Sequence, residues 1–117
     1  MTEHMKRRRA EIPDLNTREL LSFFSKIRKG EGKRRPCWEW TGSKNKDGYG
    51  TFGLRRKNRF AHVVSWTIEH GQIPDHLEID HLCRKRGCVR PDHMELVTHR
   101  ENLMRGNTIV ARKKVAA

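Results

Sequence analysis

The sequence predicts a small α+β domain built from short strands and helices. A chain of 117 residues has the length of one domain, with or without tails. Hydrophobic residues make up 34% and aromatic residues 7% of the chain, so its core is small and a disulfide or a metal ion is expected to stabilise it. Short strand-like segments and two helix-start signals define the expected elements.

The N-terminal part is predicted to be a basic arm followed by a helix. Residues 1–12 are rich in basic side chains and are expected to be flexible. Asn16 and Glu19 have the spacing of a capping box, and hydrophobic residues recur after them at helical intervals. We therefore expect a helix over about 17–29, ended by Gly30 and followed by a charged linker.

From Pro36 onward the pattern changes to short strands. Three strands are expected, over residues 37–42, residues 49–54 and from residue 59 onward. The last two would form a β-hairpin with a basic turn at residues 55–58. Residues 61–70 suit a helix closed by Gly71.

The C-terminal part is predicted to fold as strand, loop, strand and helix. Strands are expected over residues 77–82 and 94–97, on either side of a loop rich in Cys, Arg and Gly. Thr98 and Glu101 again have capping-box spacing, so a helix should start there and end at Gly106.

The charge of the chain indicates a polyanionic partner. Lys and Arg number 26 against 14 acidic residues, giving a net charge of +12 and a pI near 10.4, and nucleic acid is the first candidate for such a surface. No apolar run of transmembrane length, signal peptide or lipidation motif is found, so an intracellular, soluble chain without a membrane partner is expected. We expect a basic arm and helix over 1–35, a central domain over 36–106 and a basic tail over 107–117.

The cysteines predict a structural zinc site. Three cysteines without a secretion signal argue against a disulfide framework. Cys83, Cys88 and His93 follow one another at steps of five residues, and Cys37 supplies a fourth ligand from upstream. Four such ligands suit a closed tetrahedral zinc site. The alternative is that Cys83 and Cys88 are small buried hydrophobic residues and His93 lies on the surface.

The neighbours of these ligands predict a phosphodiesterase centre. Asp80 and His81 end the strand before the loop, and Asn102 lies in the final helix, which should fold back against them. Hydrolysis of a phosphodiester needs a base that activates water and a divalent cation that stabilises the leaving 3′ oxygen. His81 suits the base because imidazole titrates near neutrality, and the oxygens of Asp80 and Asn102 suit Mg²⁺.

These motifs resemble a known family of nucleases. Residues 77–106 resemble the ββα-metal finger of HNH, or His-Me finger, nucleases, and the predicted zinc ligands resemble those of His-Cys box homing endonucleases. Residues 36–106 as a whole are similar to small phage and intron-encoded HNH endonucleases. The resemblance implies a metal-dependent endonuclease that hydrolyses double-stranded DNA, with His81 as general base and Asp80 and Asn102 as ligands of Mg²⁺ or another divalent ion. A monomer would nick DNA, whereas a homodimer would cut both strands.

Basic residues of the hairpin, the zinc loop and the final helix are candidates for DNA contact. They are Arg55, Arg56, Lys57, Arg59, Arg84, Lys85, Arg86 and Arg105. The hairpin could enter the major groove, or it could be a solvated basic turn. Of the other histidines, His62 is expected to pack in the fold, and His99 is the main rival of His81 as the base.

Two other functions fit part of the pattern. One is a zinc-stabilised DNA-binding module without catalysis, which would use the same zinc loop and basic surface. The other is an RNA-directed nuclease or a packaging accessory. Asp80, His81 and Asn102 favour the endonuclease, because a binding module has no need of a base and two oxygen ligands in this arrangement.

Overall fold

The computed structural model describes residues 11–30 and 35–106, which form three helices, one short 3-10 helix and three two-stranded antiparallel sheets. The elements are α2 (Thr17–Ser25), β1 (Ile27–Lys29), β2 (Trp38–Trp40), β3 (Thr51–Leu54), β4 (Lys57–Phe60), α3 (Ala61–His70), β5 (Leu77–His81), η1 (Pro91–His93), β6 (Met94–Thr98) and a final helix over residues 99–106. This arrangement confirms the predicted α+β class. The predicted tail and most of the predicted N-terminal arm lie outside the described residues.

The first helix begins where the sequence predicts and ends earlier. The capping box is present, since the Glu19 amide donates to Asn16 Oδ1 at 2.8 Å and the Asn16 amide donates to Glu19 Oε1 at 2.9 Å. The predicted span to residue 29 is wrong, because α2 ends at Ser25 and Ile27–Lys29 forms β1. Antiparallel pairing with β2 replaces the last helical turn, so a contact from a distant segment overrides the local helical pattern.

The predicted hairpin and central helix are confirmed, but β4 begins at Lys57, two residues earlier than predicted, so the turn is shorter than the predicted 55–58. β3 pairs antiparallel with β4, and α3 follows β4 directly. Three aromatic side chains from α2, β2 and β3 (Phe23, Trp40 and Phe52) form the centre of the core, with ring centroids 5.0–5.9 Å apart. Trp38 and Trp66 are half-buried.

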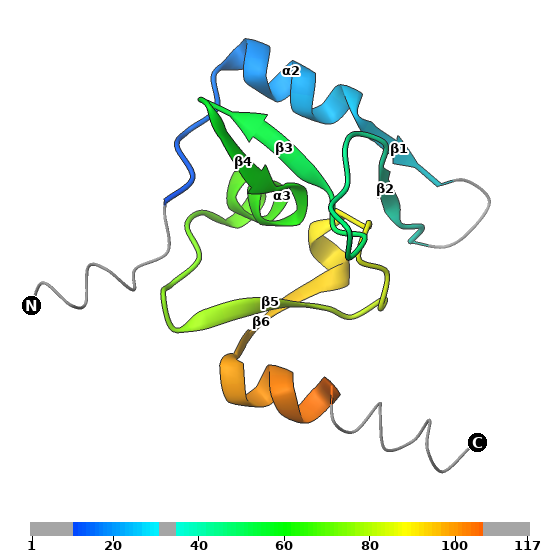
Figure 1. Cartoon of the computed structure of the whole chain (residues 1–117), viewed down its shortest axis with the longest axis vertical. Helices are drawn as coiled ribbons and strands as arrows, with labels where there is room; N and C mark the ends of the chain where they lie inside the picture. Colours follow the sequence, from blue (N-terminus) through cyan, green and yellow to red (C-terminus); the bar gives the residue numbers. More distant parts are fainter. Residues whose placement is uncertain (1–10, 31–34, 107–117) are drawn as a thin grey trace, which may run out of the picture.

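The C-terminal part forms the predicted strand, loop, strand and helix. β5 pairs antiparallel with β6, from Leu77 opposite Thr98 to His81 opposite Met94. The second capping box is present, since the Glu101 amide donates to Thr98 Oγ1 at 3.1 Å and the Thr98 amide donates to Glu101 Oε1 at 2.9 Å. Figure 1 shows α2 and the β3–β4 hairpin at one end of the molecule, with β5, β6 and the final helix at the other.

Among the described residues, no helix is both long and apolar enough to cross a membrane.

Candidate active site and metal centre

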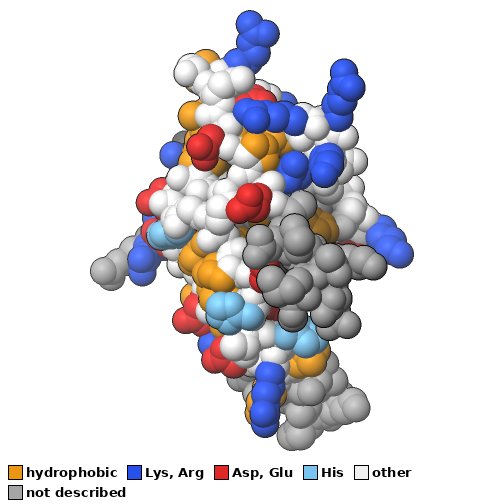
Figure 2. Space-filling model, turned by 90° about the vertical axis from the view of Figure 1, so that its left-hand side faces the viewer, with side chains coloured by type: hydrophobic (Ala, Val, Ile, Leu, Met, Phe, Trp, Pro, Cys, Tyr) orange, Lys and Arg blue, Asp and Glu red, His pale blue; other side chains and the backbone are white. Residues whose placement is uncertain are grey.

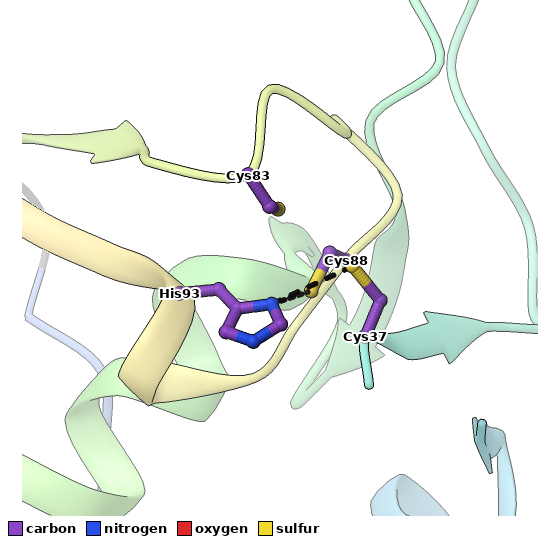
Figure 3. A group of neighbouring side chains, drawn as sticks. All are labelled: Cys37, Cys83, Cys88 and His93. Atoms are coloured by element: carbon purple, nitrogen blue, oxygen red, sulfur yellow. Dashed lines mark hydrogen bonds between the residues drawn. The ribbon is translucent and has the colours of Figure 1, made fainter. Parts of the chain in front are cut away.

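The four predicted zinc ligands converge on one point (Figure 3). Their ligand atoms all lie within 4.8 Å of one another, and His93 Nδ1 is 3.5 Å from the sulfurs of both Cys37 and Cys88. A tetrahedral zinc site with Zn–S near 2.3 Å and Zn–N near 2.0 Å places an S and an N ligand about 3.5 Å apart. The donor set and its spacing therefore fit a metal ion such as zinc.

Backbone contacts bring the distant Cys37 to the other three ligands. Cys37 immediately precedes β2, and the amide of Val89 donates to the carbonyl of Trp38 at 2.9 Å. The amide of Trp40 donates to the carbonyl of Gly87 at 3.0 Å. β2 is thus paired with the loop that carries Cys83 and Cys88, while η1 presents His93 from the other side.

Two of the predicted ligand thiols, those of Cys83 and Cys88, have raised pKa values. Burial raises the pKa of the Cys88 thiol to about 12, and burial also raises the pKa of Cys83. Metals bind the thiolate, so metal binding at this cluster must release protons.

His81 is buried at the end of β5, and its ring contacts the backbone carbonyl of Cys88 in the loop between β5 and η1. Its ring packs against His62 at a centroid distance of 4.8 Å and against Tyr49 at 6.0 Å. Its Nε2 lies 3.1 Å from the carbonyl oxygen of Cys88. A carbonyl can only accept a hydrogen bond, so Nε2 carries the proton and Nδ1 has the free lone pair. Burial lowers the pKa of His81, which favours the neutral ring.

Asp80 faces the opposite side of β5, toward the final helix. Its carboxylate is only 6% exposed and accepts from Arg84 Nη1 at 3.0 Å and from Arg105 Nη1 at 2.7 Å. Arg105 also contacts Glu95 at 2.8 Å, and Glu95 is the β6 residue that lies opposite Asp80. This pair of contacts fixes the last turn of the helix to both strands. Arg84 adopts a left-handed backbone conformation, with φ of 62°, and its side chain is 48% exposed.

Asn102 lies against the same side of β5, and its partner there is Glu78, which is not among the predicted site residues. Its Nδ2 donates to Glu78 Oε1 at 2.6 Å. Glu78 stands two residues before Asp80, so both side chains share one face of the strand. The two-residue spacing between Glu78 and Asp80 is the sequence feature that could have indicated Glu78 as a site residue. His99, the rival candidate for the base, contacts Glu78 Oε2 at 3.0 Å and is exposed.

Residues 59–104 match a family model described as HNH endonuclease. This range holds Asp80, His81 and Asn102, together with three of the four cluster ligands. The chain belongs to the HNH endonuclease family. HNH domains act on DNA.

Two phage proteins are related to this HNH chain. It is 31% identical over 70 residues to the uncharacterized gene 5.3 protein of Enterobacteria phage T3, over 55% of this chain and 69% of that protein. It is 30% identical over 66 residues to Protein 7.7 of Escherichia phage T7, over 56% of this chain and 51% of that protein. No solved structure gives a significant match.

The basic hairpin of the HNH chain is partly occupied by internal contacts. Arg55 donates to both carboxylate oxygens of Glu19, at 3.1 and 3.2 Å, and to the carbonyl of Asp14 at 2.8 Å. Arg59 donates to the carbonyl of Glu11 at 3.1 Å. Arg56, in the turn, and Lys57, the first residue of β4, are exposed. The hairpin therefore combines residues that anchor it with residues that face solvent.

Two basic residues of the metal-binding loop have different surroundings, Arg86 beside Tyr49 and Lys85 in a cleft. Arg86 donates to the carbonyl of Asp47 at 3.0 Å and stacks on the ring of Tyr49. Lys85 lines a cleft of about 470 Å³, together with Arg28 and Lys44. Figure 2 shows one face of the molecule, where acidic side chains and histidines separate the Lys and Arg side chains.

Proposed function

We propose that this HNH chain is a divalent-metal-dependent endonuclease that hydrolyses phosphodiester bonds of double-stranded DNA, with His81 as the general base. The observation that carries this proposal is the contact between His81 Nε2 and the carbonyl of Cys88. It leaves Nδ1 to take the proton of an attacking water. Membership of the HNH family supports a nuclease function.

The surroundings of His81 support its role. A base must be unprotonated before the reaction, and the lowered pKa of the buried imidazole keeps it neutral at physiological pH. In the proposed reaction, water attacks the phosphorus atom, its proton passes to His81, and the bond to the 3′ oxygen breaks.

Asp80 and Asn102 are the proposed ligands of the catalytic ion. Mg²⁺ prefers oxygen donors and usually takes one or two carboxylates, with water and phosphate completing its shell. Each oxygen of Asp80 accepts one arginine, and a carboxylate offers about four lone pairs in all. Asp80 can therefore bind an ion while keeping both arginines. When bound, the ion would stabilise the negative charge on the leaving oxygen.

Exposed basic side chains are the proposed DNA contacts. Arg56, Lys57 and Lys85 are exposed, and Arg84 is half exposed beside Asp80. We propose that Arg84 reaches the scissile phosphate and the others contact flanking phosphates. The other predicted DNA contacts already have hydrogen-bond partners within the protein; they are Arg55, Arg59, Arg86 and Arg105. We propose that these residues also hold the DNA-binding surface in its conformation.

The test is cleavage of supercoiled plasmid by the full chain, in Mg²⁺ and in EDTA. The His81→Ala variant is assayed beside the wild type under the same conditions. We expect Mg²⁺-dependent cleavage that the variant loses, while its metal content and DNA affinity stay unchanged. The ratio of nicked to linear product then separates a monomer from a homodimer. DNA binding without cleavage in any divalent ion would instead identify a non-catalytic DNA-binding module.

A further inference from the structure

Glu78 connects the strand of the proposed active site to its helix. The residue lies on β5, and its side chain is 35% exposed. One carboxylate oxygen, Oε1, accepts from Asn102 Nδ2 at 2.6 Å, and the other, Oε2, lies 3.0 Å from His99 Nδ1. Both partners come from the first turns of the final helix, so one carboxylate contacts two helical residues.

The chemistry of the two groups fixes the orientation of the Asn102 amide. An ionised carboxylate can only accept hydrogen bonds, whereas an amide side chain has a donating end and an accepting end. Because Nδ2 donates to Glu78, Oδ1 must point away from Glu78. Oδ1 is the only atom of this side chain that can bind a hard cation. We propose that Glu78 is a positioning residue that holds Asn102 with Oδ1 available to the divalent ion; this inference rests on the proposed function.

The structure around Glu78 fixes its position relative to the final helix. The pairing of β5 with β6 fixes Glu78 opposite Val97, one residue before the capping box at which the final helix starts. Further along, Arg105 joins the same helix to Asp80. Two contacts therefore join β5 to the final helix, one between Glu78 and Asn102 and the other between Asp80 and Arg105. Without the contact to Glu78, the Asn102 side chain would be free to rotate about its side-chain bonds and to flip its amide.

Two other roles for Glu78 make different predictions. As a direct metal ligand, Glu78 would need its negative charge, so Glu78→Gln would be as harmful as Glu78→Ala. As a purely structural strap, it would affect stability and leave metal affinity in the folded protein unchanged. As a positioning residue, it needs only an acceptor oxygen near Asn102, which a glutamine side chain retains.

The experiment measures Mn²⁺ affinity by electron paramagnetic resonance on the full, zinc-loaded chain, beside Mg²⁺ titrations of plasmid cleavage. We expect Glu78→Ala to weaken Mn²⁺ binding by about 10-fold or more, as is typical when a group that orients a metal ligand is lost. Glu78→Gln should keep most of the affinity. Zinc content and the melting temperature, Tm, verify that each variant is folded.

A double-mutant cycle with Asn102→Ala decides the route of the effect. If Glu78 acts through Asn102, Glu78→Ala has little further effect on Mn²⁺ affinity once Asn102 is alanine. Three results would overturn the inference while the proposed function stands. They are additive losses of Mn²⁺ affinity in the cycle, equal losses in Glu78→Ala and Glu78→Gln, and wild-type Mn²⁺ affinity in Glu78→Ala. A wild-type chain that neither cleaves DNA nor binds Mn²⁺ overturns the proposed function, and the inference with it. If Glu78→Ala does not fold, loss of Mn²⁺ affinity in folded Glu78→Gln overturns the inference, and retention supports it.

Discussion

Nε2 of His81 and the carbonyl oxygen of Cys88 lie 3.1 Å apart, so the proposed base is hydrogen-bonded to the backbone of a metal-cluster residue. The sulfur of Cys88 faces the cluster, and its carbonyl faces the imidazole. A change that moves the Cys88 carbonyl would therefore remove the hydrogen bond that fixes the orientation and tautomer of His81. Cluster and base form one structural unit, although they are predicted to do different chemistry.

We expect cleavage to be lost as the pH falls. Burial lowers the pKa of His81 from its ordinary value near 6.5, so the ring is neutral and able to accept a proton above that lowered value. Below it, the protonated ring can no longer act as a base. Initial cleavage rates at saturating Mg²⁺ should therefore show an acid limb below pH 6.5. A limb centred above neutrality would contradict the assignment of His81.

Cys83→Ser should remove the metal and destabilise the fold. In small zinc domains, metal binding contributes roughly 10 kcal/mol or more to folding, and this chain has a small core. We expect the variant to purify with little zinc and a much lower Tm, by metal analysis and thermal unfolding. Lys85→Ala, an exposed change in the same loop, is the matched control. An unchanged Tm without zinc would show that the metal does not stabilise this fold.

Gly50→Ala should be destabilising, whereas Gly53→Ala should not. A Cβ atom at Gly50 would lie 2.4 Å from Cδ1 of the fully buried Trp40, which cannot move without disturbing the core. Such overpacking costs about 1–3 kcal/mol. At Gly53 the nearest such neighbour is Asn58 Oδ1, at 3.9 Å, so an alanine fits there. Urea unfolding of both variants measures the difference, and equal stability would refute this account of the core.

Arg55 and Lys57 should respond differently to alanine substitution. Arg55 is paired with Glu19, and this hydrogen bond lowers the pKa of the Glu19 carboxyl, so Arg55→Ala should reduce Tm slightly. Lys57 is exposed, so Lys57→Ala should leave Tm unchanged. If Lys57 contacts a DNA phosphate, its loss lowers the salt dependence of binding by about one ion. Affinities measured over a range of salt concentrations would show whether the slope changes.

The elements that depend on local signals could be predicted from the sequence. Both capping boxes define helix starts, because their hydrogen bonds lie within four residues of chain. The end of α2 could not be predicted in this way. Ile27 continues the helical spacing of the preceding hydrophobic residues, yet it pairs with Trp40 in β1 and β2. The partner strand lies across a linker, and local periodicity carries no information about it.

The same limit applies to the candidate site. The even spacing of Cys83, Cys88 and His93 was sufficient to predict the cluster, and Cys37 was the only cysteine left to complete it. The partners of the charged side chains were not predictable, because they come from distant segments. Arg55, for instance, is 36 residues away from Glu19 in the chain, and Glu78 is 24 residues away from Asn102.

Cys37 determines how much of this chain constitutes a transferable nuclease module. It lies outside residues 59–104, the range that matches the HNH family, yet it completes the metal cluster. A fragment limited to that range would keep three ligands and leave a coordination position for water, as in catalytic zinc sites. Cutting the chain at the family boundary would therefore change the character of the metal site as well as shorten the protein. A functional unit must begin upstream of β2.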